Sequence, residues 1–122
     1  MPFDGATLPP IAKTLVDARG FLERGWCRGT EARTVHGNKV SPCHPDAVSW
    51  CLYGAIAAVN TPFIGSSMNI VERVLQSLND PHTIRLLADF PKITVFNDRQ
   101  VSVEPVLAVV DQAIALAITE NK

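Results

Sequence analysis

The chain has 122 residues, of which 47% are hydrophobic and 19% charged, which argues against a disordered protein. One domain over residues 1–122 is expected, with an ordered core of about 9–119. The 11 basic and 12 acidic residues give a formal net charge of −1, so no overall field favours nucleic acid or an anionic membrane. The longest apolar run, residues 50–59, is about half of a bilayer span. With no signal pattern and an odd number of cysteines, we expect a cytoplasmic protein.

The first predicted helix begins at Pro9 and Pro10, because proline is tolerated in a first helical turn. Four apolar residues then follow at helical spacing and share one face: Ile11, Leu15, Ala18 and Leu22. Gly20 lies in the middle of this helix at a small cost, and Gly25 is expected to end it in a left-handed conformation.

The second predicted helix spans residues 45–60 and begins at Pro45 and Asp46, a proline and an acid suited to a first turn. Residues 47–59 are apolar on nearly every side, which predicts a helix covered by its neighbours. We therefore expect the central helix of the fold here. Gly54 inside it indicates a close neighbouring segment, for which Trp26 is a candidate.

Three further helices are predicted in the second half of the chain. One covers residues 67–78, a short one covers residues 80–91, and the last begins after Ser102, a favourable N-cap residue. The expected fold class is all-α: a compact bundle of four to five helices around the helix at 45–60.

Two stretches do not fit a helical pattern. Within residues 26–44, Thr34-Val35 and Lys39-Val40 could pair across Gly37-Asn38, which gives a minor β-hairpin near 34–40. Residues 93–96 alternate weakly and predict a short extended segment. Long loops in compact domains are often functional, so both stretches are candidate sites.

Three short motifs occur in order along the chain: Gly-Trp-Cys-x-Gly at 25–29, Pro-x-Ala-Val-x-Trp-Cys-x-x-Gly-Ala at 45–55, and Phe-Asn-Asp at 96–98. With this order and spacing, the chain resembles a small bacterial and phage family, domain of unknown function 6197, over roughly residues 11–118. The resemblance implies an α-helical fold and supplies no activity.

The three cysteines allow two kinds of reactive site. Three thiols and an imidazole are the right ligand count for zinc, and the candidates are Cys27, Cys43, His44 and Cys51. Alternatively Cys27 or Cys51 is a nucleophile, with His36, His44 or His82 as the base and Asn97 or Asp98 as the orienting group. The residues favour a third interpretation, in which a buried thiol packs as a small hydrophobic side chain.

The ligand-binding candidates are Trp26, Arg28, Arg33, Trp50, Asn97 and Asp98. Tryptophans are more often core anchors than ligand walls, and an Asn-Asp pair more often locks a turn, here the one before the last helix. Residues 24–44 hold four basic residues and one acidic residue, a local charge of +3. This charge favours a small anionic ligand or an acidic protein surface, whereas nucleic acid is disfavoured because the whole chain is not basic.

These observations favour a non-catalytic binding or accessory module. Its contact surface would be the loop at 26–44 and the turn at Asn97 and Asp98, and no cofactor is expected. The alternative is a cysteine-dependent or zinc-assisted hydrolase that uses Cys27 or Cys51 with a histidine. The apolar last helix would also allow a homodimer.

Overall fold

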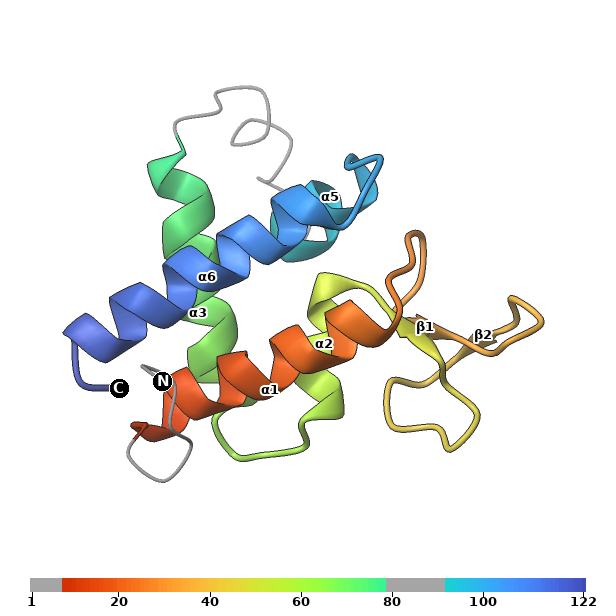
Figure 1. Ribbon diagram of the computed structural model, residues 1–122, viewed down its shortest axis with the longest axis horizontal. Helices are drawn as coiled ribbons and strands as arrows, with labels where there is room; N and C mark the ends of the chain where they lie inside the picture. Colours follow the sequence, from red (N-terminus) through yellow and green to blue (C-terminus); the bar gives the residue numbers. More distant parts are fainter. Residues whose placement is uncertain (1–7, 79–91) are drawn as a thin grey trace.

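The computed structural model describes residues 8–78 and 92–122, and these residues form five helices and a small three-stranded antiparallel sheet (Figure 1). The long helices are α1 (Pro10–Arg24), α3 (Ile64–Ser77) and α6 (Glu104–Thr119), and the short ones are α2 (Leu52–Ala58) and α5 (Lys92–Asp98). The long helices contact one another, with α6 alongside α1, while the sheet lies beyond the C-terminal end of α1 (Figure 1). The prediction of a mostly helical fold is confirmed.

Helix α1 begins where the sequence predicts, with Pro10 in its first turn. Its buried face, which includes Leu15, Ala18 and Leu22, packs in the core against α2, α3 and α6. Gly25 follows the helix, but its φ of −178° is extended and not left-handed as predicted. A glycine is needed there for another reason, because a Cβ would overlap the carbonyl oxygen of Val48.

The prediction of a helix over residues 45–60 is correct only for its second half. Helix α2 spans Leu52–Ala58, whereas residues 45–48 form a turn and an irregular segment. Strand β3 (Ser49–Trp50) precedes the helix, and Cys51 is its N-cap, with Sγ accepting a hydrogen bond from Gly54 N at 3.3 Å. The helix that does form is central, because it contacts α1, α3, α5 and β3.

The close neighbour of Gly54 is the backbone of Glu31, and not Trp26 as predicted. A Cβ at position 54 would overlap the carbonyl oxygen of Glu31. The same oxygen accepts a hydrogen bond from Cys51 N at 3.1 Å. The loop before the sheet is thus fixed directly on the first turn of α2.

The sheet has the order β2-β1-β3, with β1 (Ala32–Arg33) between β2 (Lys39–Val40) and β3. Ala32 pairs with Val40 on one side and with Trp50 on the other. The strand that pairs with Lys39–Val40 is therefore Ala32–Arg33, which lies two residues before the predicted partner, Thr34-Val35. The physical reason is that Ala32 is fully buried between two strands, while Thr34 N and Oγ1 bond Asn38 to close the turn.

The predictions for the second half are partly confirmed. Helix α3 covers the helix predicted at 67–78 except for its last residue, Leu78, which is the C-cap, and it begins earlier, at Ile64. The helix predicted at 80–91 lies outside the described residues. The last helix begins where expected, but its N-cap residue is Val103 and not Ser102. Among the described residues, no helix is long and apolar enough to cross a membrane.

The extended segment predicted at 93–96 is wrong, because these residues belong to α5. Ile93 and Asn97 are buried and lie four residues apart, so one face of this short helix carries both of them inward. Helix α5 contacts α2 and α3, and this tertiary packing overrides the extended preference of the β-branched residues.

Candidate functional site

Asn97 is completely buried and connects the three sequence motifs through its side-chain amide. Its Oδ1 accepts hydrogen bonds from Trp26 Nε1 at 2.7 Å and from the backbone N–H of Leu52 at 3.0 Å. Its Nδ2 donates to the carbonyl oxygen of Cys27 and to Asp98 Oδ1, both at 3.1 Å. An amide side chain has two donor and two acceptor positions, so this one is fully used inside the protein. We call these contacts the Asn97 junction.

The Asn97 junction supports the start of α2. Leu52 is the first residue of that helix, and its N–H has no partner within the helix. The side chain of Asn97, from α5, supplies the missing acceptor. Asp98 extends the junction, because its Oδ1 also accepts from Gly29 N at 3.0 Å. The two side chains therefore tie α5 to α2 and the 28–30 loop, and not to the last helix as predicted.

The tryptophans both have internal partners for their indole N–H groups. Trp50 Nε1 donates to the carbonyl oxygen of Pro42 at 3.0 Å, and the Trp50 ring packs edge-on against Phe21 with centroids 4.8 Å apart. Trp26 forms a parallel bridge with Trp50, which brings Cys27 N within 3.1 Å of the Trp50 carbonyl oxygen. This arrangement supports the anchoring role of both residues.

The two motif cysteines, Cys27 and Cys51, are buried, with 8% and 2% of their surface exposed. Burial raises the pKa of Cys27 and raises that of Cys51 to about 11. The thiolate is the nucleophilic form of cysteine, and burial disfavours that form at both positions. Cys51 also lines a small pocket of about 140 Å³ with Gly29, Thr30, Glu31, Thr94 and Asp98, and this set includes no histidine.

The four candidate zinc ligands are not brought together. Cys27 and Cys51 are buried, whereas Cys43 and His44 are exposed. His44 Nδ1 accepts a hydrogen bond from Asp46 N at 3.0 Å. In residues 8–78 and 92–122, no three His, Cys, Asp or Glu side chains are grouped as a metal site. The predicted four-ligand set therefore does not form.

The two described histidine candidates for a catalytic base, His36 and His44, are exposed, unlike the buried thiols. His36 is exposed in the turn between β1 and β2, and His82 lies outside the described residues. In the described part of the chain, no hydrogen bond joins a histidine to a cysteine. Within residues 8–78 and 92–122, neither Cys27 nor Cys51 therefore has a hydrogen-bonded histidine to act as its base.

Four basic residues lie around the sheet: Arg24, Arg28, Arg33 and Lys39. We call them the basic surface. Among the described residues, none of them has an acidic side chain within ion-pair distance. By contrast, four other basic residues form ion pairs elsewhere: Lys13, Arg19, Arg73 and Lys122. Sequence reasoning named Arg28 and Arg33 as ligand candidates but not Arg24. The missed signal is the position of Arg24 one turn after Phe21, which puts the guanidinium over that ring.

Neutral backbone groups hold two of these arginines. Arg33 donates to the carbonyl oxygens of Arg28 at 2.9 Å and Gly37 at 3.0 Å. Arg28 donates to the Gln100 carbonyl oxygen at 2.8 Å and lies 5.9 Å from the centroid of the Trp26 ring. Bonds to carbonyl oxygens position a guanidinium without neutralising it, so the surface keeps its positive charge.

A family model described as a family of unknown function, DUF6197, matches residues 6–116. No curated protein and no solved structure matches the chain.

Proposed function

We propose that this chain, which belongs to the DUF6197 family of unknown function, is a non-catalytic module that binds an anionic partner through the basic surface. The observation that supports the proposal is the contrast in ion pairing. Lys13 and Arg19 of α1 and Arg73 of α3 have acidic partners. The four residues of the basic surface, which include Arg24 at the end of α1, have none among the described residues.

The basic surface is positioned before a partner arrives. Arg33 ties the 28–30 loop to the turn at Gly37, and Arg28 ties it to the segment after α5. Gly29 N is held by Asp98, which belongs to the Asn97 junction. A preorganised surface loses less conformational entropy on binding, which favours affinity for a carboxylate or phosphate group. In this proposal the three motifs build the support and the arginines make the contact.

The proposal predicts weak, salt-dependent binding of a ten-residue poly-L-glutamate. In a ¹H–¹⁵N NMR titration at low ionic strength, we expect shifts of the backbone amides of residues 28–39. Lys39→Gln removes an exposed charge from β2 and should weaken binding about threefold, because one exposed charge pair contributes up to about 1 kcal/mol.

The matched control is Gln76→Glu, which lowers the net charge by the same amount on α3, away from the sheet (Figure 1). This variant should bind like the unmodified protein. Equal weakening by both variants, or a titration without shifts at residues 28–39, would show that the basic surface is not the contact surface.

A further inference from the structure

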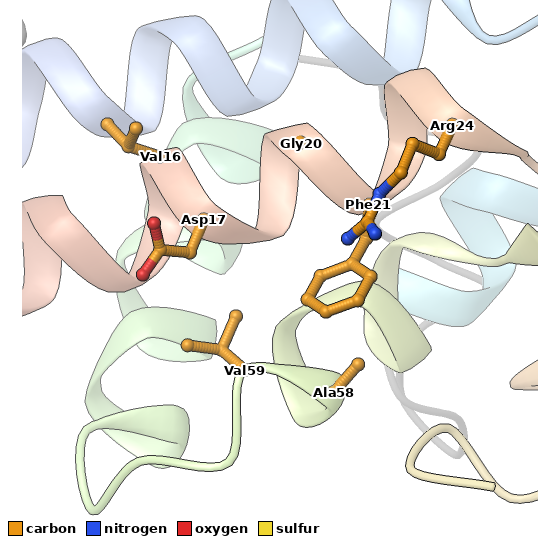
Figure 2. Close-up of a pocket in the computed structure, with 7 residues that line it drawn as sticks. All are labelled: Val16, Asp17, Gly20, Phe21, Arg24, Ala58 and Val59. Atoms are coloured by element: carbon orange, nitrogen blue, oxygen red, sulfur yellow. The ribbon is translucent and has the colours of Figure 1, made fainter. Parts of the chain in front are cut away.

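Two hollows in the protein surface meet at Arg24. The first, of about 420 Å³, lies between residues 16–24 of α1 and Ala58 and Val59. The second, of about 370 Å³, is lined by part of the 42–47 segment and shares Phe21, Arg24 and Ala58 with the first. Figure 2 shows Asp17 and Arg24 at opposite ends of the first hollow, with Gly20 between them on α1. Because the two hollows share Phe21, Arg24 and Ala58 of α1 and α2, we call them together the groove.

Arg24 gives this groove a charged centre. Its guanidinium carbon lies 4.4 Å from the centroid of the Phe21 ring and 5.7 Å from that of Trp50. Stacking on two rings orients the planar guanidinium while its N–H groups stay available. Among the described residues it has no acidic partner, so an incoming carboxylate would be the first.

Gly20 provides a second, independent observation. A glycine inside a helix costs stability relative to alanine, and it is usually explained by a close neighbour. No described heavy atom outside the local helix backbone lies within 4 Å of the position that a Cβ would take at Gly20. The space is therefore open, and it belongs to the first hollow. The missing side chain allows another backbone to approach α1 closely.

Each hollow has apolar side chains beside polar groups. Val16, Val59 and Ala58 line the first hollow, and Pro42, Pro45 and Trp50 line the second together with Cys43, His44 and Asn60. The acid at the far end of the first hollow, Asp17, is already paired with Lys13 at 2.7 Å. Among the residues that line the two hollows, Arg24 is thus the cation common to both, and the one carboxylate, Asp17, already has a basic partner.

We propose that the groove binds an extended peptide segment of a partner protein, with an acidic side chain on Arg24 and an apolar side chain in each hollow. This inference rests on the proposed function and names the class of partner. Alternate side chains of an extended peptide point the same way, so an apolar–x–acidic–x–apolar pattern matches a cation between two hollows. The peptide backbone passes over Gly20.

The probe is the acetylated and amidated peptide Gly-Leu-Ser-Glu-Ser-Leu-Gly, titrated into the ¹⁵N-labelled full chain. We expect shifts of the Gly20 and Arg24 amides and of the Trp50 indole N–H, with a millimolar or tighter dissociation constant. Replacing the peptide glutamate by glutamine should weaken binding at least fivefold. Arg24→Gln should do the same, and Arg24→Lys should have an intermediate effect because lysine keeps the charge without the planar fork.

Gly20→Ala separates a binding role from a structural one. The variant should melt several degrees higher, because alanine favours the helix and no described atom obstructs its Cβ. It should nevertheless bind the peptide at least fivefold more weakly. The control Gly65→Ala, on α3 with open space around its Cβ, should leave peptide binding unchanged. A Gly20→Ala variant that binds the peptide normally would overturn the inference.

Other outcomes identify a different occupant and also overturn the inference. N-acetylglutamate that binds as tightly as the peptide would make the groove a site for small anions. Concentration-dependent shifts of the Gly20 and Arg24 amides without peptide would make it a contact between two copies of this chain. A third outcome is that poly-L-glutamate shifts the amide signals of residues 28–39 while the peptide leaves those of Gly20 and Arg24 unchanged. This result would support the proposed function and contradict peptide binding in the groove.

Discussion

Asn97→Ala is expected to lower the free energy of unfolding by about 4 kcal/mol, which is near the upper end for a single substitution. Alanine leaves three groups without their partner: the Trp26 indole N–H, the Leu52 backbone N–H and the Cys27 carbonyl oxygen. Each buried group that loses its hydrogen bond costs about 1–3 kcal/mol. Urea denaturation, followed by tryptophan fluorescence, measures the difference.

Asp98→Ala is the control at the neighbouring position. Asp98 is exposed, and its carboxylate bonds Gly29 N and the Asn97 amide, so its loss should cost about 1 kcal/mol. If the two variants lost similar stability, the Asn97 junction would not be the structural centre that the distances indicate.

Gly54→Ala is expected to destabilise the protein by about 3 kcal/mol, although alanine is the better helix former by about 1 kcal/mol. The new Cβ would meet the carbonyl group of Glu31, which is a backbone group and has no rotamer by which to move away. The loop is also held there by the hydrogen bond from Cys51 N. Thermal and urea unfolding of the purified variant provide the measurement.

The matched comparison for Gly54→Ala is again Gly20→Ala. Both glycines lie inside helices, and only the one in α2 has a backbone against it. We therefore expect the two substitutions to change the free energy of unfolding in opposite directions. Gly54→Ala should be less stable than the unmodified chain, and Gly20→Ala should be more stable. A Gly54→Ala variant with unchanged stability would mean that Glu31 does not lie against α2 in solution.

Local patterns predicted the parts of the fold that depend on local energies. The start of α1 follows from the prolines at positions 9 and 10, and its buried stripe follows from apolar spacing. The same spacing located α3, although the true start at Ile64 carries no side-chain cap to mark it. These elements have one apolar face and one polar face, which is the condition under which periodicity is informative.

The second helix shows where local patterns fail. Residues 47–59 are apolar apart from Ser49, and such an apolar run does not distinguish a buried strand from a buried helix. Ser49 and Trp50 extend because Ala32 and Arg33 offer them strand partners, and Trp26 bridges to Trp50. These partners lie far away in the sequence, so no window around position 50 contains the information.

At the candidate site too, the sequence identified residues but not the contacts that they make with distant parts of the chain. Sequence reasoning singled out Asn97, Asp98 and both tryptophans, and the structure brings Trp26, Asn97 and Asp98 into one network. Their roles depend on distances between residues about 70 positions apart along the chain. Residue types alone favoured anchoring and turn-locking roles for these side chains and left a ligand site as the alternative. The groove at Arg24 was missed because Phe21 and Arg24 look like the ordinary end of an amphipathic helix.

The central claim is that the sequence motifs form a closed internal support and that binding takes place at the basic residues outside it. Reaction of the native Cys43→Ser variant with Ellman's reagent tests this claim most directly. That variant retains only Cys27 and Cys51, both buried, and the Cys51 pocket of about 140 Å³ is too small for a bulky aromatic disulfide. We predict labelling only as fast as the protein unfolds. Labelling of either thiol within seconds at neutral pH would instead reveal a reactive centre and contradict the account.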